Sequence, residues 1–76
     1  MKTAIKDRIT DAYSAGMTLT SLAYRVFPPA LWPRAWNHAA KGGPPAWSRT
    51  LCVALRRYGF VVDAGSDGIR RVWRRS

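Results

Sequence analysis

Arginine is the residue type in this chain that most clearly indicates a binding chemistry. The sequence has 76 residues, and six of its ten arginines lie between positions 56 and 75. A guanidinium group stays charged at any physiological pH and presents a planar set of donors that matches phosphate oxygens. A dense arrangement of such groups at one end of a small chain indicates a polyanionic partner.

One predicted helix, residues 46–58, positions part of this charge. Its apolar residues recur at the spacing of a single helical face. Arg49 and Arg56 lie about two turns apart on the other side, with Arg57 on one flank. Ser48 and Thr50 fall near the helix start, where hydroxyls and free backbone amides favour phosphate. The apolar face consists of Trp47, Leu51, Ala54, Leu55 and Tyr58.

The residues after this helix predict a β-hairpin over residues 60–75. Phe60, Val61 and Val62 favour a strand, and a loop rich in Gly, Ser and Asp follows them. The return strand alternates imperfectly, and we expect Trp73 to anchor it in the core. This strand carries the remaining candidate phosphate-binding residues, Arg70, Arg71, Arg74 and Arg75.

Two further helices are expected upstream, over residues 3–15 and 19–27. The first shows apolar residues at helical spacing and is followed by Gly16, a typical C-terminal glycine cap. Thr18 is the expected N-cap of the second, and Pro28-Pro29 ends it.

The segment 28–45 is the least regular part of the chain. It contains all five prolines, and a short helix is expected within it over residues 33–40. Trp32 and Trp36 are assigned to the core rather than to base stacking, since a small domain needs their apolar area.

The segments 18–27 and 48–75 together resemble a winged helix-turn-helix domain. The resemblance rests on a capped Thr-Leu-Thr-Ser-Leu-Ala helix, and on a last helix ending in a Leu-x-x-x-Gly-aromatic step, followed by a strand, a Gly/Asp tip and a basic return strand. It implies a single mainly α domain with a small hairpin (α+β), spanning residues 1–76, that binds DNA. The family usually joins the two helices by a tight turn, whereas residues 28–45 intervene here.

Composition excludes several other classes of protein. The formal net charge is +9, and the only acids are four aspartates. One cysteine, Cys52, and one histidine, His38, provide neither a disulfide nor a metal cluster, and no phosphate-binding glycine motif is present. We therefore expect no enzyme activity, no cofactor and no metal. No segment has the length of a membrane span or the character of a secretory signal, so a cytoplasmic location is expected.

The leading hypothesis is a small DNA-binding regulator or recombination accessory factor of bacterial or phage type, with double-stranded DNA as its partner. Two alternatives stay open: a protein-interaction module that binds an acidic partner, and an RNA-binding domain. The arginines also admit simpler roles. Arg49 and Arg56 would then form a solvated helix face, Arg56 and Arg57 would bind the carbonyls at the helix end, and the C-terminal arginines would be an unstructured tail.

Overall fold

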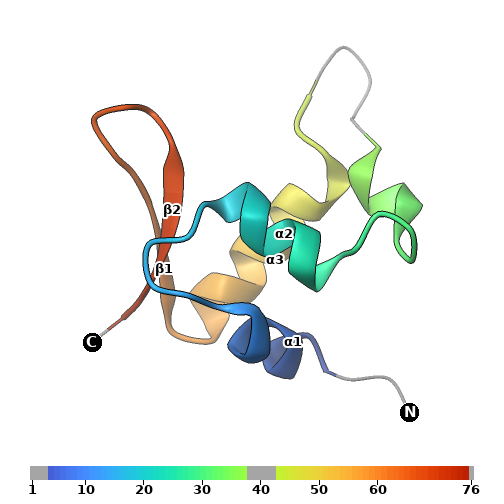
Figure 1. Cartoon of the computed structure of the whole chain (residues 1–76), viewed down its shortest axis with the longest axis horizontal. Coiled ribbons are helices and arrows are strands. Elements are labelled where there is room, and N and C mark those ends of the chain that lie inside the picture. Colours follow the sequence, from blue (N-terminus) through green and yellow to red (C-terminus); the bar gives the residue numbers. More distant parts are fainter. Residues whose placement is uncertain (1–3, 38–42, 76) are drawn as a thin grey trace.

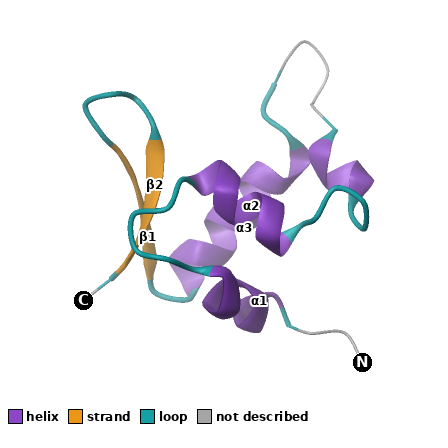
Figure 2. Cartoon of the chain, in the orientation of Figure 1, coloured by secondary structure: helices purple, strands orange, loops and turns teal. Residues whose placement is uncertain are grey.

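The chain folds into three α-helices and one antiparallel β-hairpin (Figure 1). This computed structural model describes residues 4–37 and 43–75. Figure 2 shows the hairpin standing at one side of the helices, with the segment that joins the second and third helices at the other side. The expected fold class, mainly α with a small hairpin and winged-helix-like, is confirmed. The elements are α1 (Ile5–Ala12), α2 (Leu19–Val26), a 3-10 helix (Pro33–Trp36), α3 (Ala46–Arg57), β1 (Phe60–Ala64) and β2 (Arg70–Arg74).

The three helices bury the apolar faces that their spacing predicts. Leu22, Leu51 and Leu55 are fully buried, and the core also holds Ile9 from α1. Thr18 caps α2 as expected, because its Oγ1 accepts a hydrogen bond from the backbone N–H of Ser21 at 3.1 Å. Both α2 and α3 end within one residue of the predicted positions.

The first helix is shorter than its pattern predicts. It ends at Ala12, with Tyr13 as C-cap, rather than at residue 15. Gly16 is therefore not the cap of this helix. It lies in a separate turn closed by the Met17 N–H, which donates to the Ser14 carbonyl at 3.0 Å.

The segment between α2 and α3 is fastened to both helices by Trp36. The indole ring stacks on Tyr24 with centroids 4.4 Å apart and lies 5.4 Å from the ring of Trp47. Its Nε1–H donates to the Phe27 carbonyl at 2.7 Å. The core assignment thus describes Trp36 well, whereas Trp32 remains 40% exposed. Within the predicted helix 33–40, residues 33–36 form a 3-10 helix, and residues 38–40 lie outside the described residues.

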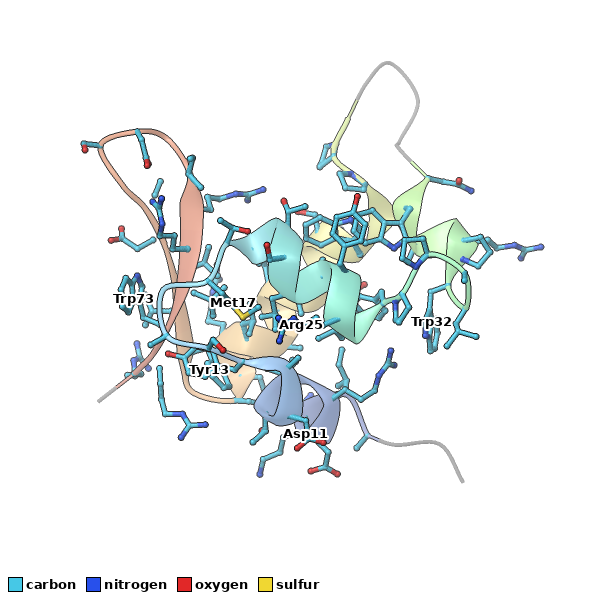
Figure 3. All side chains as sticks on the ribbon, in the orientation of Figure 1. Asp11, Tyr13, Met17, Arg25, Trp32 and Trp73 are labelled. Carbon is cyan, nitrogen blue, oxygen red and sulfur yellow. The ribbon has the colours of Figure 1, made fainter. Side chains whose placement is uncertain are left out.

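The hairpin joins the core through Val72 of β2 and Phe60 of β1, and not through Trp73. Val72 is fully buried, and Trp73 is 45% exposed. Figure 3 shows Trp73 on the side of the hairpin that faces away from the helices. The prediction for Trp73 was wrong because alternation identifies two faces of a strand without saying which one packs inward.

A short extended segment before α2 makes β2 the central strand. The Val72 N–H donates to the Met17 carbonyl at 2.8 Å, and the Gly16 N–H donates to the Val72 carbonyl at 3.1 Å. Thr18 and Arg71 form the antiparallel bridge. On its other side β2 pairs with β1, in the register Val62 opposite Val72.

Replacing Gly16 with alanine is expected to destabilise the fold more than replacing Gly68 with alanine. Both glycines have a left-handed φ, +77° and +78°, which costs an alanine about 1–2 kcal/mol. At position 16 the added Cβ would also lie 3.0 Å from Cη2 of Trp73, whereas at position 68 it meets nothing within 4 Å. Overpacking of this kind adds about 1 kcal/mol. Thermal unfolding of both variants measures the difference, and equal losses would contradict the Trp73 contact.

Candidate nucleic-acid interface

The outer side of α3 is a continuous exposed surface, here called the basic face. With 3.6 residues per turn, its members fall on one side of the helix, opposite Trp47, Leu51 and Leu55. In Figure 1 this helix lies behind α2, so its exposed side points away from the viewer. The basic face consists of Arg49, Thr50, Val53, Arg56 and Arg57, all of them exposed.

An open groove of about 420 Å³ runs between α3 and the hairpin, and we call it the arginine groove. Arg56 reaches it from α3. Arg70 stands two residues before buried Val72, so it projects from the same side of β2, toward the helices. Arg75 follows the end of β2. The lining residues are Cys52, Arg56, Phe60, Val61, Val62, Arg70 and Arg75, and none of them is acidic.

Within residues 4–37 and 43–75, no acidic side chain forms an ion pair with the arginines of this surface. Among the residues that the structure describes, the one ion pair joins Arg71 to Asp67, with Nη2 and Oδ2 3.1 Å apart. The positive charges of Arg49, Arg56, Arg57, Arg70 and Arg75 therefore face solvent without an acidic partner in the described part of the chain. Such groups attract a polyanion strongly because no internal pair has to be broken.

Arg71 occupies a different position, at the tip and on the outer side of the hairpin. Both of its terminal nitrogens bind the Asp67 carboxylate, at 3.1 and 3.3 Å. The hydrogen bond from Arg71, together with that from the Ile69 N–H, lowers the pKa of Asp67. The two hydrogen bonds to this carboxylate hold the Arg71 side chain at the tip.

Arg74 is exposed, but its guanidinium group lies against two aromatic rings. Its guanidinium carbon lies 5.6 Å from the ring centroids of both Tyr13 and Phe60. Its backbone N–H donates to the Tyr13 hydroxyl at 2.8 Å. These contacts place Arg74 at the junction of β2 with the end of α1, and it does not line the arginine groove.

Ser48 lies on the inner side of α3 and is only 7% exposed. It is thereby separated from Thr50 and Arg49, with which the sequence groups it. Its direction follows from its place in the helix, since it precedes Leu51 and Cys52 by one turn. Six of the nine predicted residues therefore lie on the basic face or in the groove: Arg49, Thr50, Arg56, Arg57, Arg70 and Arg75. A seventh, Arg71, lies at the tip of the hairpin.

One of the simpler roles for the arginines is excluded for the described residues, and no hydrogen bond supports a second. Residues 70–74 pair with β1, so the hypothesis of an unstructured C-terminal tail is wrong for them. The described residues contain no hydrogen bond from Arg56 or Arg57 to the carbonyls at the end of α3. A solvated helix face remains compatible with the exposure of Arg49 and Arg56.

Sequence reasoning missed Val53 as part of this surface, and it placed Cys52 on the same side of the helix as Arg49 and Arg56 without predicting a groove. Val53 is 59% exposed at the centre of the basic face. Its position between Arg49 and Arg56, at four and three residues, is the signal that identifies it. Cys52 is half-buried and lines the groove, which requires knowledge of where the hairpin packs.

Residues 4–37 and 43–75 contain no group of three His, Cys, Asp or Glu side chains placed to hold a metal ion. None of their helices combines the length and apolar character that crossing a bilayer requires. The prediction for His38 concerns a residue outside the described part of the chain. Comparisons with protein-family models, with curated proteins and with solved structures found no match to this chain.

Proposed function

We propose that this chain is a double-stranded DNA-binding domain of the winged-helix kind. In this proposal α3 enters the major groove with its basic face, and the hairpin lies along the adjacent sugar-phosphate backbone. The major groove admits an α-helix, and its guanine edges accept hydrogen bonds from arginine. The cellular role that fits is that of a small bacterial or phage regulator or recombination accessory factor acting in the cytoplasm.

The observation that supports this proposal most is the position of five arginines along α3 and the arginine groove, none of which has an acidic partner among the described residues. Arg49 and Arg56 project from α3 at the spacing of two helical turns. Arg70 and Arg75 extend the positive surface across the groove to the hairpin. Phosphate contacts from such a strip fix the position of a protein on a duplex, while side chains on the helix read base edges.

Duplex binding with a steep dependence on salt is the expected result of the main test. If the charges of Arg49, Arg56, Arg57, Arg70 and Arg75 each displace one counterion, whether the side chain contacts a phosphate or a base edge, the slope of log K against log salt is about −4.5. Fluorescence anisotropy with a labelled duplex, at salt concentrations from low to physiological, measures this slope. Competition with double-stranded RNA at matched salt tests for DNA preference. Absence of duplex binding at low salt would contradict the proposal.

Val53 is expected to contact the methyl group of a thymine. It is the apolar centre of an otherwise polar face, and apolar side chains contact the thymine methyl in the major groove. In a site selected from random duplexes, replacing the facing thymine with deoxyuridine should weaken binding by about fourfold. Val53→Ala should lose most of this sensitivity. Equal sensitivity in both proteins would exclude Val53 from base contact.

A further inference from the structure

The outer edge of β1 presents unpaired backbone groups. Both hydrogen-bonding groups of Val72 point toward residues 16 and 17, so Val72 makes no backbone bonds with Val62, its partner in β1. In an antiparallel pair, bonded and non-bonded positions alternate. The N–H and C=O groups of Phe60, Val62 and Ala64 therefore point away from β2.

Bonds at either end of the hairpin confirm this alternation. The Arg75 N–H donates to the Gly59 carbonyl at 2.7 Å, and the Gly65 N–H donates to the Ile69 carbonyl at 3.2 Å. Positions 59 and 65 thus point inward, and the even-numbered residues between them point outward. Within the described residues, no hydrogen bond reaches the outward groups of Val62. An exposed edge of this kind is a template for another strand.

The arginine groove lies against this edge. Phe60, Val61 and Val62 form one wall of the groove, and Cys52 and Arg56 of α3 form the other. An extended chain paired with β1 would enter this space. Its alternate side chains would point toward α3, as those of Phe60 and Val62 do, and the others would lie beside Val61, which is 39% exposed on the outer side.

The charges along the groove decide which strand fits. Arg56, Arg70 and Arg75 surround the space with three positive groups and no acid. A second copy of this chain would bring its own arginines to the same place and carries a net charge of +9. Like charges placed opposite each other disfavour pairing, and edge strands use charge in this way to prevent self-association.

We propose that the edge of β1 is a docking site for an extended acidic segment of another protein, added to the hairpin as an additional strand. The partner places acidic side chains at every second position, toward Arg56 and Arg70, and β-branched side chains at the intervening positions, beside Val61. Main-chain hydrogen bonds to Val62 provide affinity, and the charge pattern provides selectivity.

This site goes beyond the proposed function and does not require it. Arg56 and Arg70 belong both to the strand-docking groove and to the surface proposed for DNA. An acidic strand and a duplex would therefore exclude each other, and the partner would act as a competitive regulator of DNA binding.

The test uses a peptide in which glutamate and valine alternate, with both ends blocked, and the full chain labelled with ¹⁵N. At saturating peptide, hydrogen exchange of the Val62 amide should slow by at least about tenfold, because this amide gains a partner. Exchange of the Val61 amide, which points into the hairpin, serves as internal control. An unchanged Val62 amide at saturation, or no binding, would overturn the proposal.

Two control peptides separate backbone pairing from attraction between charges. Methylation of the alternate peptide nitrogens that face β1 keeps every charge and removes donors, and should abolish the protection of Val62. Lysine in place of glutamate keeps the donors, and should weaken binding by at least about tenfold. Equal binding of the methylated peptide would show that charge alone holds it, and the proposed strand pairing would be wrong.

Val62→Pro is the matched change in the protein. Proline is tolerated in an edge strand where the N–H points outward, so the hairpin keeps its internal bonds. The variant should bind the peptide about fivefold more weakly, because one hydrogen bond is lost. If the unaltered chain binds duplex DNA but does not bind the peptide, only the strand site is rejected. Peptide binding without duplex binding would reject only the proposed DNA function.

Discussion

Replacing Arg56 and Arg70 together with glutamine is expected to weaken duplex binding by about a hundredfold. Both side chains line the arginine groove, one from α3 and one from β2, without an acidic partner among the described residues. A hydrogen bond to a charged group contributes about 1.5 kcal/mol or more. Two lost hydrogen bonds of this kind to the duplex then amount to about 3 kcal/mol, which corresponds to two orders of magnitude in Kd. Anisotropy titrations at fixed low salt measure the change.

The matched control is the pair Arg25→Gln and Arg34→Gln. It lowers the net charge by the same amount, but neither residue lines the groove, and Arg25 lies on the near side of the molecule in Figure 3. This control should bind duplex within about fivefold of the unaltered chain, since only long-range attraction is reduced. Equal losses in the two double variants would show that overall charge, and not the groove, governs binding.

Replacing Leu51 with alanine is expected to cause a large loss of stability. Leu51 is fully buried on the inner side of α3, in the core shared by α1, α2 and the hairpin. A buried leucine replaced by alanine costs about 3 kcal/mol, through lost burial and the cavity left behind. A chain of 76 residues has about 4–11 kcal/mol of stability in total. The melting temperature should therefore fall by about 15 °C, as measured by circular dichroism.

Val53→Ala provides the control on the same helix. Val53 is 59% exposed, so its truncation removes little buried area, and alanine favours the helix more than valine does. The free energy of unfolding should stay within about 0.5 kcal/mol of the original value. A similar loss for both variants would contradict the assignment of the inner and outer sides of α3.

The helices and hairpin follow from local patterns in the sequence. The apolar stripe of α3 and the Thr18 cap of α2 are each contained in a short window, so helical spacing and capping chemistry predict them. The end of α1 was predicted three residues too late. The turn at Ser14–Met17 is held by the Gly16 N–H bond to Val72, which is a contact between distant parts of the chain.

The sequence predicts the positions of the candidate site residues that lie on one helix. It does not predict those that depend on packing between distant segments. The positions of Arg49 and Arg56 follow from helical periodicity, and both are exposed. The packing of Arg74 depends on Tyr13, which lies 61 residues earlier. No local pattern reveals that contact, nor which side of β2 carries the arginines into the groove. The groove itself arises from the angle between α3 and the hairpin, which tertiary packing determines.

Because β2 is the central strand, it connects the segment before α2 with the C-terminal hairpin. Residues 16–18 bind one edge of this strand and β1 binds the other, so β2 cannot separate without breaking contacts on both sides. The base of the hairpin should therefore open only with the whole domain, whereas the loop between the strands opens locally. A pull applied to the hairpin by a bound partner would be transmitted to the junction of α1 and α2, and this rigidity keeps the hairpin at a fixed angle to α3.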